Sequence, residues 1–242
     1  MAAIIVQLEC LTNMHVGNGD VNFNIIDNEV ERDVTTGYPT VNASGVKGAL
    51  REFFKKKGIA SDTVNSLFGS EEKSGKLKFL SADMLAIPMR ASAGEAAYYL
   101  VSTQEALAGY KEKCKLFINS DVTFSETDVK GCDAEGISLP KVTKVSWGEE
   151  EKNVYILGNE EFASVSLPVI ARNKLEDGRS TNLWYEEVVP HKALFSFAVL
   201  AEDTDGASLT EFVNVIKNNP IVQFGGNASI GYGLCKVSVK EA

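Results

Sequence analysis

The sequence predicts an α+β fold built on a ferredoxin-like sheet that carries helices on one face. A strand over 3–11 and a helix over 44–57 stand near the beginning, and a strand–helix–strand unit over 194–239 closes the chain. Residues 119–152 are polar and interrupted by glycine and proline, which is typical of an insertion between two such units. Because this fold serves many functions, the function has to be argued from individual sites.

Hydrophobic periodicity and punctuation define the separate elements. Alternate residues from Ile4 to Cys10 share one face of the first strand. Ser44 can cap the helix over 44–57, and Gly58 stands just past its end. Further elements are expected as helices at 62–68, 103–113 and 208–218, and as strands at 76–80, 194–201 and 234–239.

Composition limits the class of protein. The chain has 242 residues, 44% of them hydrophobic, and a formal net charge of −9, which excludes general disorder. We take residues 1–242 as a single domain, although the length also suits two small ones. The acidic balance argues against coating nucleic acid with the whole surface, but not against binding along one basic track.

The N-terminal segment does not resemble a signal peptide, and no apolar run reaches the ~18 residues of a membrane span. The four cysteines are scattered, without the spacing of a zinc site or a redox pair. We therefore expect a cytoplasmic protein with reduced thiols and no membrane partner.

A basic stripe follows the helix over 44–57. Lys47, Arg51 and Lys55 recur at spacings of four, and the stripe begins at the helix N-terminus. Free N–H groups and the helix dipole favour phosphate at that end. Most charged helix faces are only solvated, so the stripe alone leaves both interpretations open.

A glycine-rich run precedes the last strand, with Gly225, Gly226, Gly231 and Gly233 in nine residues. Such a run allows close backbone approach and can present N–H groups to a phosphate. It is neither a P-loop nor a dinucleotide fingerprint, because no Gly-Lys-Ser/Thr ends it and a strand follows. A tight turn with a bulge is the alternative.

Two further features could carry chemistry. His15 follows the first strand, where it could be structural, contact RNA or act as a general acid/base. A loop carries Asp27, Glu29, Glu31 and Asp33, whose carboxylates could hold a divalent cation. Spacing alone selects none of the four.

Five blocks in chain order resemble the RAMP superfamily of CRISPR-associated proteins. The block Ala82–Gly94 resembles in particular the backbone subunits of type III-B (Cmr) effector complexes, and the backbone subunits of type III-A (Csm) complexes are the next most similar. The blocks are Leu11–Gly19, Thr36–Arg51, Ala82–Gly94, Trp184–Pro190 and Val222–Gly233.

The resemblance implies a modified RRM-like RAMP fold with insertions and a β-hairpin thumb over 168–190. It also implies a helical filament of identical subunits that holds a guide RNA (crRNA), with other type III subunits as partners. Family members cleave target RNA at each thumb with a loop aspartate and a divalent cation, Mg²⁺ or Mn²⁺. Counting back from Thr36 selects Asp27 as the catalytic residue and metal ligand.

Carried over by position, the resemblance implies a set of RNA-binding residues. The sequence departs from the family pattern at three points. Where the family has Gly-Ser-Ser-x-Lys-Gly, this chain has Ala43-Ser44-Gly45-Val46-Lys47-Gly48, so that one hydroxyl contact is lost, and Ala91 separates Arg90 from Ser92. The chain is also shorter than is usual for type III-B members. The implied RNA-binding residues are His15, Ser44, Lys47, Arg51, Arg172, Arg179, Gly225 and Gly226.

The expected function is that of a guide-RNA-binding backbone subunit that cleaves complementary target RNA at regular intervals as a metal-dependent endonuclease. Two alternatives stay open. One is an inactive RNA-binding scaffold of the same complex. The other is a metal-independent RAMP endonuclease that processes guide precursor with His15 as general acid/base.

Overall fold

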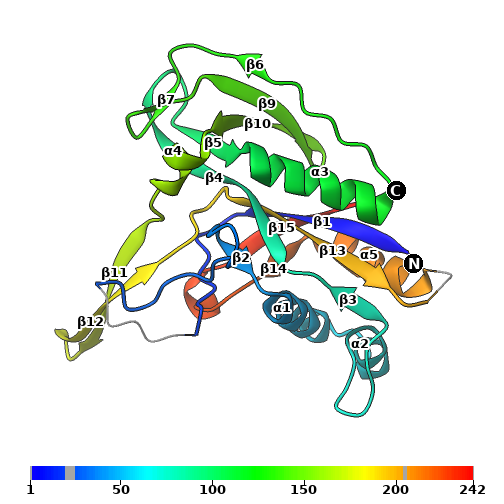
Figure 1. The fold of residues 1–242 in the computed structure, drawn as a ribbon. Helices are drawn as coiled ribbons and strands as arrows, with labels where there is room; N and C mark the ends of the chain where they lie inside the picture. Colours follow the sequence, from blue (N-terminus) through cyan, green and yellow to red (C-terminus); the bar gives the residue numbers. More distant parts are fainter. Residues whose placement is uncertain (1, 20–24, 204–205, 242) are drawn as a thin grey trace.

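A mixed sheet forms the centre of the computed structural model, which describes residues 2–19, 25–203 and 206–241 (Figure 1). Its strand order is β14-β15-β1-β13-β4-β5-β10-β9-β6. The strands on this path are β1 (Ala3–Cys10), β4 (Ala82–Ala93), β5 (Tyr98–Thr103), β6 (Thr127–Asp128), β9 (Lys141–Trp147), β10 (Glu150–Leu157), β13 (Leu194–Ala201), β14 (Ile221–Gln223) and β15 (Leu234–Lys240). Shorter strands join it at β2 (Thr40–Val41), β3 (Leu77–Phe79), β7 (Asp133–Ala134) and β8 (Ile137–Ser138).

The predicted ferredoxin-like arrangement is present at one end of this sheet. Strand β1 lies between β15 and β13 and is antiparallel to both, with Val6 opposite Val239 on one side and Phe197 on the other. Strands β3 and β4 both pair with β13. Helix α1 (Ala43–Lys56) follows β1 and β2, and α5 (Ala207–Asn218) follows β13 and precedes β14 and β15. The α+β fold class is therefore confirmed.

Helices cover both faces of the sheet, so the expectation of helices on one face is wrong. On one face, α1, α2 (Ser61–Phe68) and α5 share a core with Val6 and Leu8, in which Phe54 stacks on Phe212 at 5.5 Å. On the other face lies α3 (Gln104–Ile118), which packs with Ile5 in a second core. That face of the central strands is also apolar, and it therefore needs a cover of its own.

Helix ends differ slightly from the predicted ones. The helix expected from Ser44 begins at Ala43, with Asn42 at its cap and no side-chain cap bond, so Ser44 lies inside the first turn. Thr103 caps α3 and accepts a hydrogen bond from the Ala106 N–H at 3.1 Å. That helix continues past Lys113 because Cys114 and Ile118 extend its buried face. None of the described helices is long and apolar enough to cross a bilayer.

A hairpin of β11 (Val169–Glu176) and β12 (Arg179–Glu187) projects from the body where the thumb was expected (Figure 1). Asp177 and Gly178 form its turn, both with positive φ. Such a turn matches the right-handed twist of the two strands. A short helix, α4 (Asn159–Ala163), precedes the hairpin.

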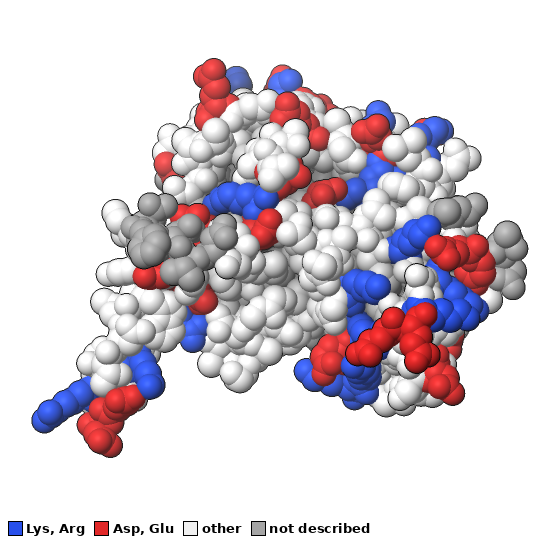
Figure 2. Space-filling view, turned by 60° about the horizontal axis from the view of Figure 1, so that its bottom comes forward, with Lys and Arg blue, Asp and Glu red and all other residues white. Residues whose placement is uncertain are grey.

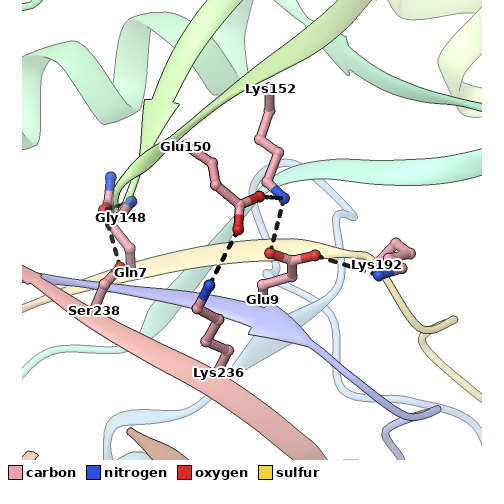
Figure 3. Close-up of polar contacts among 8 residues, drawn as sticks. All are labelled: Gln7, Glu9, Gly148, Glu150, Lys152, Lys192, Lys236 and Ser238. Carbon is pink, nitrogen blue, oxygen red and sulfur yellow. Dashed lines mark hydrogen bonds and ion pairs between the residues drawn. The ribbon is translucent and has the colours of Figure 1, made fainter.

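The region 119–152 extends the sheet, because β10 pairs in parallel with β5 and β9 pairs with β10. The turn between β9 and β10 is fastened to β1 and β15 by a polar network (Figure 3). Gln7 accepts a hydrogen bond from the Gly148 N–H at 2.8 Å. Buried Glu9 forms an ion pair with Lys152 at 3.0 Å. Glu150 forms two ion pairs, with Lys152 at 2.6 Å and with Lys236 at 3.1 Å. These contacts close β9 and β10 over the second core.

This network gives folding stability a pH dependence at Glu150. Bonds from Lys152 and Lys236 hold the pKa of Glu150 at about 2, below its usual 4.5. Because folding lowers this pKa, the stabilisation is present above about pH 4.5 and is lost as the pH falls toward 2. We expect Glu150→Gln to melt below the wild type at about pH 7, with a gap that narrows between pH 4.5 and 2.

Thermal melts across that pH range measure the effect, and Glu151→Gln is the matched control. Glu151 is an exposed neighbour whose only ion pair in the described residues joins it to Lys144 within the same hairpin. If the difference in melting temperature between Glu150→Gln and the wild type were the same at both ends of the pH range, Glu150 would not be the source of the pH dependence.

Candidate nucleic-acid interface

Three segments that are distant in the sequence meet at the base of the thumb. The loop after β1 lies between the end of β12 and the glycine-rich loop before β15. Met14 and Val189 exchange two backbone hydrogen bonds, each 2.8 Å long. On the other side, the Gly226 N–H donates to the His15 carbonyl at 2.9 Å, and the Gly233 N–H donates to the Asn13 carbonyl at 2.8 Å.

The close approach predicted for the glycine-rich loop is satisfied inside the protein. Gly225 has φ +76°, and a Cβ placed there would lie 2.2 Å from the His15 carbonyl oxygen. The neighbouring Gly226 N–H is already hydrogen bonded to that oxygen. Packing against the His15 loop therefore accounts for Gly225, whereas a Cβ at Gly226 would lie 3.9 Å from the same oxygen, which is ordinary contact. The Gly226 N–H is engaged by that oxygen and is not available to a phosphate. Contact of either glycine with RNA stays a prediction.

Glu186 connects the thumb to the glycine-rich loop. This buried carboxylate accepts hydrogen bonds from Arg172 at 2.9 Å and from the Asn227 amide at 2.7 Å. The Arg172 guanidinium also lies over the rings of Trp184 and Tyr232, 5.6 Å from each centroid. Arg172, predicted to contact RNA, is thus an internal brace that leaves 22% of its side chain exposed.

Glu187 makes the matching connection to the acidic loop. It is also buried, and it accepts from the Val30 N–H at 3.0 Å and from Arg32 at 2.6 Å. Sequence reasoning did not single out Glu186, Glu187 or Arg32. The signal was present, because two adjacent acids inside the apolar run Trp184–Pro190 must place one carboxylate on each face of a strand.

His15 is held between these two glutamates. Its Nδ1 lies 2.7 Å from the Glu187 carbonyl oxygen, and its Nε2 lies 3.9 Å from a Glu186 carboxylate oxygen. A carbonyl only accepts, so Nδ1 carries the proton of this hydrogen bond. The side chain is 12% exposed. His15 therefore fixes the geometry of the loop more readily than it exchanges protons with a ligand.

Asp27 is fastened to the base of the thumb. Its Oδ2 accepts from the Tyr185 N–H at 2.8 Å, while the N–H groups of Asp27 and Asn28 both donate to the Tyr185 carbonyl. The second carboxylate oxygen makes no hydrogen bond within the described residues, and the side chain is partly exposed. One acceptor therefore remains for a ligand.

The other acids of this loop do not form a metal cage with Asp27. Bonds from the Thr36 N–H, the Thr36 hydroxyl and the Thr35 N–H occupy Asp33 and lower its pKa. No cluster of three metal-ligating side chains occurs among the described residues. Mg²⁺ is commonly held by one or two carboxylates together with substrate phosphates, and Asp27 with its remaining oxygen fits that mode.

The structure separates the members of the basic stripe on α1. Arg51 donates to the Gly69 carbonyl and to the Asn65 side chain, so it braces the end of α2. Ser44 and Lys47 are exposed and line a hollow of about 620 Å³ beneath the loop after α2. Arg179 is exposed and directly follows the thumb turn. Figure 2 shows basic and acidic side chains together at the tip of the projecting hairpin. Of the side chains predicted to bind RNA, Ser44, Lys47 and Arg179 are exposed.

Comparison with known proteins decides the family. The RAMP superfamily model matches residues 7–236. The chain is a member of the RAMP superfamily. Among curated RAMP relatives, the CRISPR system Cmr endoribonuclease Cmr4 of Pyrococcus furiosus is 27% identical over 289 aligned residues, covering 100% of this chain and 97% of the relative.

Solved RAMP structures share the fold. A chain of the type III-B Cmr-beta complex bound to cognate target RNA superposes with TM-score 0.81 at 23% identity, covering 99% of this chain and 97% of that one. Oligomeric Cmr4 from Pyrococcus furiosus superposes with TM-score 0.71 at 22% identity, covering 100% and 99%. The resemblance to the RAMP superfamily, and within it to Cmr subunits, is confirmed.

Proposed function

We propose that this RAMP protein is a guide-RNA-binding backbone subunit of a type III CRISPR complex and that it cleaves complementary target RNA. The observation that carries the proposal is the placement of Asp27, which β12 holds at the base of the thumb, with one carboxylate oxygen that bonds to none of the described residues. A relative that spans the whole chain is named an endoribonuclease, and a structural relative is bound to target RNA. Copies of the chain and other type III subunits are the proposed partners.

The thumb presents an apolar face beside Asp27. Tyr185 lies opposite Ala171, and Leu183 lies opposite Asn173, so the side chains of Tyr185 and Leu183 share one face of the hairpin. Leu183 is 57% exposed and Tyr185 38%. Apolar side chains can separate stacked bases and kink a duplex. Target RNA opened at this face would bring its backbone next to the Asp27 carboxylate.

In the proposed reaction, Asp27 orients the attacking 2′-hydroxyl of the target or holds the cation. A divalent cation bound there supplies charge stabilisation for the phosphate that is attacked. Glu187 holds the Asp27 loop through the Val30 N–H, and His15 in turn is bonded to the Glu187 carbonyl. The proposed fit of Asp27 to Mg²⁺ or Mn²⁺ rests on the donor set alone.

Burial of His15 disfavours the metal-independent alternative. A histidine that acts as general acid/base has to reach the proton that it transfers. Here Nδ1 is bonded to the Glu187 carbonyl, and Nε2 faces Glu186 in an enclosed position. The scaffold alternative keeps the same RNA contacts and differs only in cleavage.

The basic stripe predicts different outcomes for two of its members. Lys47→Ala should flatten the slope of log K against log salt for single-stranded RNA by about 0.7, because one phosphate contact is lost. Arg51→Ala should instead lower the free energy of unfolding by about 1–3 kcal/mol, because its hydrogen bonds to Asn65 and Gly69 are lost. Salt-dependent binding and urea unfolding measure the two effects.

Lys56→Ala is the matched control for charge, since Lys56 is exposed on the same helix and faces Glu52. If Lys56→Ala changed the salt slope as much as Lys47→Ala, the stripe would be a source of general attraction only.

Asp27 decides between enzyme and scaffold. In reconstituted complexes, Asp27→Ala should reduce target cleavage by at least about a hundredfold while guide and target binding persist, because one positioned catalytic group is lost. Asp27→Asn keeps an acceptor for the Tyr185 N–H and should be equally impaired. His15→Ala should reduce cleavage less. Cleavage assays with Mg²⁺, with Mn²⁺ and with chelator measure these effects.

Glu29→Ala is the control, since it removes the same charge from the same loop. Wild-type cleavage by Asp27→Ala would rule out the catalytic assignment. A wild type inactive with every metal would instead establish the scaffold.

A further inference from the structure

Two buried cysteines stand opposite each other beneath the candidate site. Cys10 on β1 pairs in register with Cys235 on β15, both are 0% exposed, and their sulfur atoms are 3.9 Å apart. Sequence spacing concealed this pair, because 225 positions separate the two residues. The other two cysteines, Cys114 and Cys132, lie elsewhere in the fold.

The local register favours a bond between them. The adjacent pair is hydrogen bonded, with the Leu11 N–H donating to the Leu234 carbonyl at 2.8 Å. The N–H of Cys10 donates to Ala193, and its carbonyl accepts from Lys192, both on the side away from β15. Cys10 and Cys235 therefore form a non-hydrogen-bonded antiparallel pair, whose Cα atoms lie about 4.5 Å apart. That separation is within the range that disulfides span.

We propose that Cys10 and Cys235 are a modification site at which an oxidant of the peroxide class forms a reversible disulfide. A Cys sulfur attacks one peroxide oxygen, the O–O bond breaks, and one water leaves with formation of a sulfenic acid. The second sulfur then attacks the sulfenic sulfur, and its thiol proton leaves with the hydroxyl as the second water. Two thiols lose two electrons, which the peroxide gains.

The bond would fasten the two loops that build the candidate site. Cys10 directly precedes the loop that carries His15, and Cys235 is the second residue of β15, one position after Leu234, which follows the glycine-rich loop. A hydrogen bond already joins the two loops where they leave the strands, because the Leu234 N–H donates to the Thr12 hydroxyl at 3.0 Å. A disulfide beneath them would make this junction covalent and would tie together the two ends of the chain.

Burial sets the conditions for the reaction. The hydrogen bond with Cys235 raises the pKa of Cys10, and burial raises it further. Little thiolate is therefore present at neutral pH. The reaction therefore needs a small oxidant and transient opening of the strand pair. The sulfur atoms would approach each other by roughly 2 Å to reach the bonded distance of about 2.05 Å.

The test treats the full chain with hydrogen peroxide a few degrees below its melting midpoint and then removes the peroxide. Thiols titrated in denaturant should fall from four to two. Peptide mapping without reductant should show Cys10 joined to Cys235. The melting midpoint should rise by at least about 4 °C and return on reduction with dithiothreitol, because the bond closes a very long loop.

Cys114→Ala, which removes another buried thiol, should keep the cross-link and the shift. Cys235→Ala should lose both. The mapping on wild-type protein needs no variant to fold. If the Cys10–Cys235 peptide is absent, the two cysteines are not a disulfide-forming site, whether all four thiols persist or other oxidation products form. A cross-link without a rise in the melting midpoint overturns its role as a fastening between the loops.

Discussion

Two adjacent buried carboxylates on β12 are the constraint on which the candidate site depends. Because successive side chains of a strand point to opposite faces, Glu186 reaches the glycine-rich loop and Glu187 reaches the acidic loop. Buried carboxylates are costly without partners. Glu186 is therefore paired with Arg172 of β11 and the Asn227 amide, and Glu187 with Arg32 and the Val30 N–H of the acidic loop. The same pair encloses His15. Loops that would otherwise be independent are therefore held in one arrangement.

The rest of the fold supplies a rigid support for that arrangement. Strands β1 and β13 are packed on both faces, by α1, α2 and α5 on one side and by α3 on the other, while β15 contributes Cys235 and Val237 to the first core. The loops of the site leave from the ends of these strands, where β1 ends at Cys10 and β15 begins at Leu234. Asp27 is thus placed by backbone hydrogen bonds to β12, and its position depends little on its own side-chain packing.

Local features were predictable from the sequence, whereas long-range partners were not. The strand Leu194–Ala201 matches its prediction, and the helix Ala207–Asn218 starts one residue earlier than predicted. Hydrophobic periodicity marks both elements, and Pro220 marks the end of the helix. The glycine at 225 was recognised as a close approach, but its partner, the His15 carbonyl, is 210 positions away. The partners of Arg172 depend in the same way on the folded hairpin. Strand β4 was missed because it is a long apolar run interrupted by Pro88, and its pairing is set by four other strands.

Amide hydrogen exchange on the complete chain tests the central role of the β12 glutamates most directly, by comparing wild type with Glu187→Ala. Loss of this carboxylate removes the acceptor of the Val30 N–H and the partner of Arg32. The account predicts faster exchange at residues 28–32 and at the adjoining end of β12. Exchange in α3 and β10, which lie in the second core, should stay as in the wild type. Unchanged protection at residues 28–32 would contradict the view that Glu187 holds the Asp27 loop in place.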